Sequence, residues 1–596
     1  MNVSVGPALA PLADDAHLLR PLLDLASSNP SHAVAAVRAG DHYSDVSAGD
    51  FVARVRRLAK GFVANGVAPG DRVALMAHTR LEWMLVDYAV LAAGGITVPI
   101  YDTSSAEQVQ WIVSDSGSVM AVVETPAMHR TMQDMDDRLP ECRRVLTIDE
   151  HGLDDLERDG LTVDDATIDE RIAALRADDL ATIIYTSGTT GRPKGCMLTH
   201  RNLHTNVLQN LDAIGSVLRP GDTALLFLPL AHSLTKANAL FGIESGLRDA
   251  FATDILHLPE ELAMVKPTLI CAVPRIFEKV YNSARHRAHS EHKGWIFDRA
   301  ANVAIRWSRE RTEGHVAPWT KAAHALFAKL VYGKVRHALG GDLRLAFSGG
   351  GPLGERLTHF FAGIGLDIFE GYGLTETSPT LTVNRPGAWK PGTVGRPVAG
   401  TSIRIADDGE ILAKGPQVFQ GYWNNPAATA DTFDEEGWFL TGDIGELDAE
   451  GYLRITGRKK ELLVTAAGKN VAPAPLEDRL RAHELISQAV VIGDARPFIA
   501  ALITLDDQAF AQWVTEHGLD GQTIGDLRET DHLRKEIQAA VDQANESVSR
   551  AESIREFVIL SRDLSIEEDE LTPTLKVRRS VVEKTYADAI DQIYSR

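Results

Sequence analysis

Short apolar runs alternate with segments of helical spacing, and this alternation constrains the fold more than any other feature of the chain. Residues 71–76, 95–100 and 119–123 are apolar enough to form buried strands, and residues 81–93 carry apolar groups at helical spacing. Strands that alternate with helices pair largely in parallel, because each helix returns the chain to the same edge of the sheet. The sequence therefore predicts an α/β fold with helices on both faces of its sheets.

The pattern changes twice further along the chain. It persists through residues 200–345, whereas residues 394–457 show the short strands and turns of a small antiparallel β region. A charged junction follows, Arg458-Lys459-Lys460-Glu461, and after it the chain has its own α+β pattern. We predict an N-terminal domain over residues 1–457, with two layered α/β subdomains and the β region, and a small mobile α+β domain over 458–596. The acid-rich residues 148–180 are expected to include an exposed connector.

Composition narrows the class of protein. A chain of 596 residues is too long for one hydrophobic core, and its net charge of −21 disfavours a nucleic-acid partner. Three well-separated cysteines show no metal or disulfide spacing, the first fifteen residues lack a basic signal segment, and no apolar run reaches the ~20 residues of a membrane span. We expect a cytoplasmic protein; a peripheral membrane contact and the oligomeric state stay open.

The loop Y-T-S-G-T-T-G-R-P-K-G, residues 185–195, is typical of a phosphate-binding loop. It follows an apolar run at 180–184 that reads as a strand, and residues 196–202 are expected to lead into a helix. Its glycines let backbone N–H groups approach anionic oxygens, its hydroxyls donate hydrogen bonds, and Lys194 adds a positive charge. The spacing around Lys194 is not that of the Walker A loop. Thr186 or Thr190 could also reach a metal-bound oxygen.

Further polar residues follow predicted strands, where α/β sheets bind their ligands. His232 comes after the strand 224–228, and Gly349, Gly350 and Gly351 come after the strand 343–347. In the next loop, Tyr372 offers a ring to stack on a base and Glu376 a carboxylate for Mg²⁺. Asp443 could chelate the two hydroxyls of a ribose.

Two basic features have a plain reading from composition alone. A run of cationic groups occupies residues 285–293 of a long predicted helix, and it reads as a solvated helix face. A membrane-surface or CoA-phosphate role is the alternative for this run, which comprises Arg285, His286, Arg287, His289, His292 and Lys293. Lys576 lies in a Thr/Pro-rich loop and by composition would be a surface lysine.

Six stretches, in order, resemble the motifs of the acyl-adenylate-forming superfamily, which includes acyl-CoA synthetases, luciferases and the adenylation domains of peptide synthetases. They are residues 185–195, 228–233, 371–376, 441–443, 451–473 and the Lys576 loop. Within the superfamily, residues 274–279, the Gly349–Gly351 run and residues 571–576 look most like long-chain fatty acyl-CoA synthetases.

The resemblance implies a role for each matching position. The 185–195 loop would hold the β- and γ-phosphates of ATP, and Thr190 and Glu376 would lie near Mg²⁺. Its contributing residues are Thr186, Ser187, Gly188, Thr189, Thr190, Gly191 and Lys194. The adenine would lie between Tyr372 and the glycine run 349–351, with Gly373 and Thr375 in the same nucleotide-binding loop. Asp443 and Arg458 would hold the ribose.

The remaining matches concern the acyl group and CoA. His232 would lie on the side of the acyl group and α-phosphate, and Lys576 would bridge the carboxylate and the α-phosphate. Lys460 matches a hinge position, and Gly468 matches a glycine that lines the pantetheine tunnel. The segment 465–470 departs from the sequence of the shorter family branches, which puts the CoA contact of Lys469 in doubt.

The function implied is ATP-dependent activation of a long-chain fatty acid to acyl-AMP and pyrophosphate, then transfer to CoA to give acyl-CoA and AMP. Mg²⁺, Lys194 and backbone donors would neutralise the phosphates while Lys576 aligns the carboxylate. Lys576 and Gly468 serve different steps from one domain, so we expect a rotation about Lys460. Two alternatives stay open: an acyl-AMP ligase that loads a carrier protein, and a non-catalytic nucleotide-binding protein. The sequence does not specify the length of the acyl chain.

Overall fold

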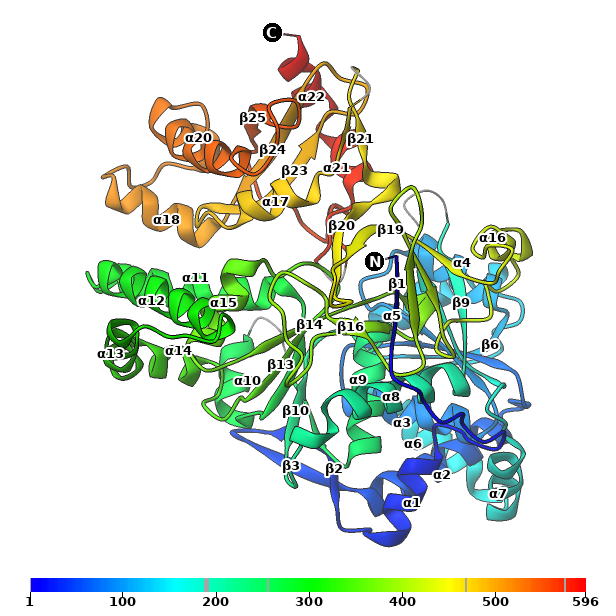
Figure 1. The fold of residues 1–596 in the computed structure, drawn as a ribbon. Coiled ribbons are helices and arrows are strands. Elements are labelled where there is room, and N and C mark those ends of the chain that lie inside the picture. The colour runs from blue at the N-terminus through cyan, green and yellow to red at the C-terminus, as the bar shows by residue number, and fades with distance from the viewer. Residues whose placement is uncertain (1, 187–191, 254–256, 467–468, 573–574, 596) are drawn as a thin grey trace.

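The computed structural model describes residues 2–186, 192–253, 257–466, 469–572 and 575–595 (Figure 1). One of its two large sheets has six strands and contains the strands predicted first from the sequence. Their order across the sheet is β7 (Val145–Thr147), β6 (Ser118–Val123), β4 (Arg72–Met76), β5 (Ile96–Ile100), β8 (Leu180–Thr186) and β9 (Lys194–Thr199). All neighbours pair in parallel except β8 and β9, which are antiparallel.

The second large sheet has nine strands and carries most of the candidate site at one edge. Their order is β16 (Arg396–Pro397), β15 (Thr380–Val383), β14 (Ile368–Gly373), β13 (Leu345–Ser348), β12 (Leu269–Ala272), β10 (Thr223–Leu226), β11 (Arg248–Phe251), β2 (Ala33–Ala39) and β3 (His42–Ser47). From β14 to β2 the pairing is parallel, so the loops that follow β13 and β14 leave the sheet at the same edge. The α/β class is confirmed.

Buried helices fill the space between the two sheets (Figure 1). The helix α3 (Leu81–Ala92) is buried along almost its whole length, as its apolar sequence requires. Beside it, α8 (His200–Ile214) packs on α9 (Ser233–Ser245). Because α9 begins directly after His232, the packing of this helix fixes the position of that histidine.

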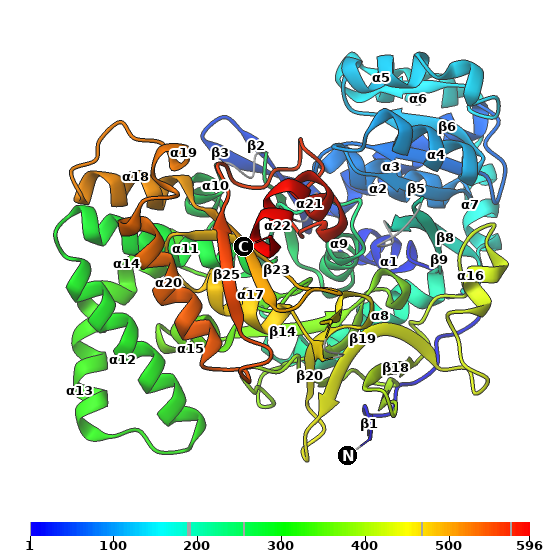
Figure 2. The ribbon, with the colours of Figure 1, turned by 90° about the horizontal axis from the view of Figure 1, so that it is seen from above.

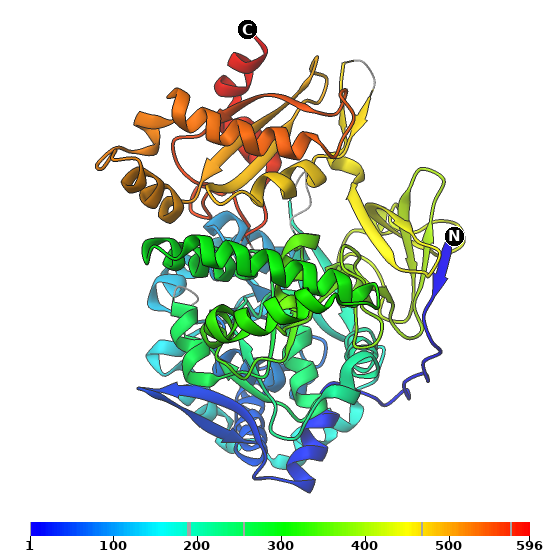
Figure 3. The same ribbon diagram turned by 60° about the vertical axis from the view of Figure 1, so that its left-hand side comes forward.

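The predicted antiparallel region is a five-stranded sheet of β1 (Val3–Val5), β17 (Ser402–Ile405), β18 (Glu410–Lys414), β19 (Phe439–Leu447) and β20 (Leu453–Arg458). Its first strand comes from the N-terminus, which lies beside this sheet in Figure 3. Sequence reasoning did not find β1, because three residues carry too little of an alternating pattern.

The C-terminal residues form a separate layer above the rest of the molecule in Figure 1. A sheet of β23 (Ile486–Ile492), β24 (Ile499–Leu505) and β25 (Ile554–Ile559) packs against α17 (Ala474–Arg481). The helices α18 (Asp507–Glu516) and α20 (Asp531–Asn545) complete the predicted α+β pattern. The two hydrophobic clusters of this part contain only residues from Leu463 onward. Where the chain divides into domains stays a prediction.

Two local features were not predicted in full. Residues 196–202 lead into a helix as expected, since α8 begins at His200, but residues 196–199 belong to β9, so the 185–195 loop joins two antiparallel strands. The acid-rich residues 148–180 also contain α6 (Gly152–Asp159) and α7 (Asp165–Ala174), which the sequence did not reveal. Leu153, Leu156 and Ile168 are buried there, whereas most of the acidic side chains face water.

Two buried histidines near the N-terminus make the fold sensitive to acid. Burial lowers the pKa of His17 to about 4 and that of His200 to about 3, and the backbone N–H of Leu18 donates to Nδ1 of His200 at 3.3 Å. Both rings are therefore neutral in the folded protein, whereas an unfolded histidine binds a proton below about pH 6.5. The unfolded state gains protons as the pH falls, so stability falls with it.

We expect the free energy of unfolding to drop between pH 7 and pH 5 by about 2 kcal/mol for each histidine. Urea titrations at the two pH values measure this difference. In His200→Gln the decrease in the free energy of unfolding should be smaller by the contribution of His200. His42 is exposed, so His42→Gln should behave as wild type. A pH dependence that is identical in all three proteins would contradict the assignment.

Candidate active site

A cavity of about 2180 Å³ lies where the edge of the nine-stranded sheet, the small β sheet and the C-terminal residues meet. Most predicted site residues line it, although they come from distant parts of the chain: Thr186, Lys194, His232, Gly349, Gly350, Gly351, Tyr372, Gly373, Thr375, Glu376, Asp443, Arg458, Lys460 and Lys576. Ser187, Gly188, Thr189, Thr190, Gly191 and Gly468 are outside the described residues. Lys469 is not part of the lining; its Nζ pairs with Glu552 at 3.3 Å.

Two glycines are required by the shape of the cavity wall. Gly350 has a φ of +82°, and a Cβ at this position would lie 3.5 Å from Cε of Lys576. At Gly373 a Cβ would lie only 1.6 Å from the carbonyl oxygen of Pro379. The first glycine is needed for its backbone conformation and the second for close packing of two chain segments.

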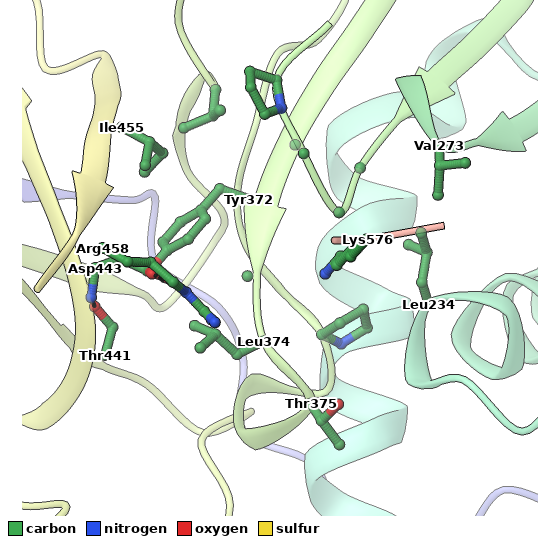
Figure 4. A pocket seen from close by; sticks show the side chains of 18 of the residues that line it. Leu234, Val273, Tyr372, Leu374, Thr375, Thr441, Asp443, Ile455, Arg458 and Lys576 are labelled. Atoms are coloured by element: carbon green, nitrogen blue, oxygen red, sulfur yellow. Dashed lines mark hydrogen bonds and ion pairs between the residues drawn. The ribbon is translucent and has the colours of Figure 1, made fainter. Parts of the chain in front are cut away.

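One end of the cavity holds a carboxylate that two groups orient. Tyr372 donates its hydroxyl to Oδ2 of Asp443 at 2.7 Å, and Arg458 donates from Nε to Oδ1 at 2.9 Å (Figure 4). Asp443 and Arg458 are paired residues on β19 and β20, so the sheet register brings them together. Burial, reinforced by Asp443, raises the pKa of Tyr372. A fixed carboxylate beside an aromatic ring is suited to a ribose and its base.

His232 lies deeper in the cavity as a neutral imidazole. Burial, reinforced by the positive charge of Lys576, lowers its pKa to about 3. Its Nδ1 is 2.8 Å from the hydroxyl of Tyr101, a cavity residue that sequence reasoning missed. Tyr101 directly follows β5 (Ile96–Ile100), so the rule that ligands bind beyond strand ends could have identified it. The neutral ring can donate or accept a hydrogen bond but cannot supply a charge.

Lys194 and Glu376 are linked through Tyr422, a second residue that sequence reasoning missed. The ammonium of Lys194 lies 5.0 Å from the centre of the Tyr422 ring, and the Tyr422 hydroxyl donates to Oε1 of Glu376 at 2.8 Å. In the strand register Lys194 lies opposite Thr186, at the base of the predicted phosphate loop. A cation from β9 and a carboxylate from the loop after β14 therefore both line the cavity.

Lys576 enters the cavity from the C-terminal part of the chain, between Leu234 and Val273 on one side and Tyr372 on the other (Figure 4). Beside this position the N–H of Thr572 donates to the carbonyl of Lys576 at 2.8 Å. Desolvation by the surrounding protein, and then the charge of Arg458, lower the pKa of Lys576. Lys576 is exposed, as composition predicts, but the surface that it occupies is the wall of the cavity, because the composition of a loop does not show where the loop docks.

An apolar arm of the cavity extends between α8, α9 and the strands β12 to β14. Its apolar lining is supplied by Ile214, Leu234, Ala237, Phe241, Leu269, Val273, Phe347, Phe369 and Val383. The arm begins at His232 and Lys576, so a ligand with a charged head and a long hydrocarbon tail matches its polarity.

The basic run 285–293 is not simply a solvated face. In α11 (Pro274–Ser290), Arg285 forms ion pairs with Asp298 and Glu484, and Nδ1 of His286 lies 2.8 Å from Oε1 of Gln512. Glu484 and Gln512 belong to the C-terminal part of the chain. The run was misjudged because its partners are about 200 residues away in sequence.

Models of two known families match most of the chain. The AMP-binding enzyme family covers residues 24–423, and the AMP-binding enzyme C-terminal domain covers residues 460–596. Among curated proteins, the long-chain-fatty-acid–CoA ligase FadD15 of Mycobacterium bovis is 50% identical over 558 residues, 93% of each chain. Human long-chain-fatty-acid–CoA ligase 1 is 29% identical over 90% of this chain and 80% of its own.

Solved structures share the fold. An ATP-bound RpMatB-BxBclM chimera superposes with a TM-score of 0.73 at 24% identity, over 97% of this chain and 99% of the other. The adenylation domain of a carboxylate reductase from Mycobacterium chelonae has a TM-score of 0.76 at 20% identity, over 98% and 91%. The chain therefore belongs to the AMP-binding enzyme family, in its long-chain-fatty-acid–CoA ligase branch.

Proposed function

We infer that this protein activates a long-chain fatty acid with ATP, forming acyl-AMP and pyrophosphate, and transfers the acyl group to CoA, releasing AMP. The observation that carries the inference is the entry of Lys576 into a cavity that has an oriented carboxylate at one end and an apolar arm at the other. Nucleotide and fatty acid would meet at this lysine. The 50% sequence identity to a long-chain-fatty-acid–CoA ligase over 93% of the chain supports the same activity.

The adenylation step requires two anionic groups to approach each other. The fatty acid carboxylate must attack the α-phosphate, and both reactants repel unless positive charge lies between them. Lys576 is proposed to hold both groups, because its side chain lies between Tyr372 at the nucleotide end of the cavity and Leu234 in the apolar arm. His232 stays neutral and is proposed to orient the acyl carboxylate, with Tyr101 fixing its ring. Asp443 and Arg458 are proposed to bind the ribose, and Lys194 the terminal phosphates.

The residues present fit a requirement for Mg²⁺. The described residues contain no group of three or more His, Cys, Asp or Glu side chains arranged to hold a metal. Glu376 nevertheless places one oriented carboxylate at the phosphate side, and Mg²⁺ is commonly bound by one or two carboxylates together with substrate phosphates. Mg²⁺ would neutralise the phosphates, with Glu376 and Thr190 proposed as its contacts.

Thioester formation requires a different arrangement, because Lys576 occupies the cavity that the acyl-adenylate must present to CoA. We propose that residues 458–596 rotate about Lys460 and bring Gly468 to the pantetheine arm. Lys469 pairs with Glu552 in the present arrangement, so any contact with CoA phosphates would first break that ion pair.

The direct test is pyrophosphate release from ATP and Mg²⁺ across fatty acids of increasing length, with and without CoA. Release that is greatest with long chains and yields AMP and acyl-CoA is the expected result. Adenylate that forms but gives no thioester with free CoA would instead indicate transfer to a carrier protein. Absence of adenylate with every acid would indicate a protein that binds nucleotide without turnover.

Arg275 is expected to favour the adenylation arrangement, because it crosses between the two parts of the chain. From the start of α11, its Nη2 donates to Oγ of Ser487 at 2.7 Å and lies 3.8 Å from Asp506. A hydrogen bond to a charged group is worth roughly 1.5–3 kcal/mol. Arg275→Ala should therefore slow adenylate formation about tenfold or more, while the conversion of supplied acyl-AMP to thioester is unchanged or faster.

Pre-steady-state assays of the two half-reactions measure this split. Arg287→Ala, an exposed arginine of the same helix, serves as the matched control and should leave both rates unchanged. Equal slowing of both half-reactions by Arg275→Ala would show that Arg275 supports the fold rather than the arrangement.

A further inference from the structure

The segment from α13 through η6 exposes large apolar side chains that the active site does not use. Eight large apolar residues are well exposed among the described residues, and three of them, Trp319, Leu326 and Leu330, belong to this segment and are each more than half exposed. Trp319 and Leu326 lie on α13 (Pro318–Phe327), and Leu330 follows on η6 (Ala328–Tyr332). Exposed apolar groups gathered on one element usually mark an interaction site.

The opposite side of this segment is also apolar and packs into the core. The exposed apolar side chains are therefore not needed for folding. Phe327 and Tyr332 are buried in the adjacent core, as is Val335 in the following helix α14 (Gly333–Ala338). Trp319, Leu326 and Leu330 recur at intervals of seven and four residues, which places them along one side of the helix. Figures 1 and 2 show α13 at the outer edge of the molecule.

The charge of this segment is opposite to that of the chain. Residues 314–341 contain no Asp or Glu, although about four would be expected from the 82 in the whole chain. Lys321, Lys329 and Lys334 are exposed, and none of them forms an ion pair with a described residue. The protein as a whole has a net charge of −21, but this part of its surface is cationic and apolar. We call five of these residues, Trp319, Leu326, Lys329, Leu330 and Lys334, the α13 face.

We propose that the α13 face docks on the surface of an anionic lipid bilayer. Helices that lie in a membrane interface combine tryptophan and leucine on an apolar side with flanking lysines, which is the composition of this face. Each lysine near an anionic membrane adds attraction, whereas the acidic remainder of the protein is repelled, so docking is confined to this side. The described helices include none with the length and apolarity needed to cross a bilayer, so the contact is peripheral.

A bilayer fits the face better than a protein partner does. Its apolar residues project from one outer helix rather than line a groove, and the lysines beside them have no fixed partners that would impose a complementary shape. A fatty acid also partitions into bilayers, so docking would bring the enzyme to its substrate. The proposal stands on the surface itself and does not depend on the catalytic assignment.

Co-sedimentation of the full chain with vesicles tests the proposal without any substrate. Wild-type protein should bind vesicles of phosphatidylcholine with 30% phosphatidylglycerol and bind pure phosphatidylcholine at least tenfold more weakly. The triple variant Trp319→Ala, Leu326→Ser, Leu330→Ser should lose at least tenfold in binding to the anionic vesicles. Charge reversal at Lys329 and Lys334 to Glu should do the same. Leu161→Ser removes an exposed leucine elsewhere, 79% exposed, and should bind as wild type.

Activity and oligomeric state complete the test. With a fatty acid supplied below its micelle concentration, both surface variants should retain the wild-type rate, which shows that they fold and that the active site is intact. Wild-type protein that ignores anionic vesicles, or a triple variant that binds them fully, would overturn the proposal. A wild-type dimer that the triple variant converts to monomer would overturn it in favour of a second copy of the chain.

Discussion

Lys576→Ala should slow the formation of acyl-adenylate at least a hundredfold while leaving thioester formation from supplied acyl-AMP nearly unchanged. Removing one preoriented donor from a developing charge typically costs 10²–10³ in rate. Lys576 lines the cavity beside the other candidate residues, and no other described residue of the C-terminal loop 571–577 carries a charge. Single-turnover measurement of each half-reaction gives the two rates separately.

The expected asymmetry depends on Lys576 serving only the first step. Lys584→Ala removes an exposed lysine from the same part of the chain and should affect neither half-reaction. Desolvation lowers the pKa of Lys576. The adenylation rate should therefore begin to fall at a pH below the pKa of an ordinary lysine, as the ammonium loses its proton. Equal loss of both half-reactions in Lys576→Ala would refute the assignment.

Lys236→Met should lower the free energy of unfolding by about 3–5 kcal/mol, the usual cost of leaving one charge of a buried pair without its partner. Nζ of Lys236 on α9 lies 2.5 Å from Oδ2 of Asp87 on α3, and both side chains are 1% exposed. The same ammonium lies 5.2 Å from the centre of the Trp83 ring. The pair joins two helices between the large sheets, so its loss would also loosen the helix that follows His232.

The double variant Asp87→Leu with Lys236→Met separates the charge from the packing. It removes both charges and should recover most of the stability that Lys236→Met loses, because no unpaired carboxylate is left. The exposed Lys535→Met should change stability by less than about 0.5 kcal/mol. Urea unfolding of the four proteins measures these differences. A double variant as unstable as Lys236→Met would show that shape, rather than charge, dominates at this position.

The alternation of strands and helices was predictable because the apolar spacing within each short segment indicates its secondary structure. The strands β4, β5 and β6, the helix α3 and the small β sheet occur where the apolar spacing placed them. The strand β9 at residues 194–199 was not predicted, because so short a run does not distinguish a strand from the approach to a helix. Its antiparallel pairing with β8 depends on the facing strand, which a single segment does not reveal.

The residues of the candidate site likewise include some that the sequence identified and some that only the structure shows. Glycine-rich loops after apolar strands identified Tyr372 and the glycines 349–351, since the strand ends of one sheet meet at one edge. Tyr422 was missed because a tyrosine in an ordinary sequence context has no signature of its own, and Tyr101 was missed although it directly follows the strand β5. Their hydrogen bonds to His232 and Glu376 exist only once segments tens to hundreds of residues apart have packed together.

The sequence by itself determined the α/β class, the change to a small β sheet and the chemistry of the individual loops, because propensity, spacing and turn residues act over a few positions. Only the tertiary structure decided that Lys576 enters the cavity, that His232 is neutral, that Arg275 and Arg285 contact the C-terminal part, and which lysines from α13 to α14 form no ion pair with a described residue. Burial and electrostatic environment are properties of three-dimensional neighbours, and these neighbours are fixed by the packing of the whole chain.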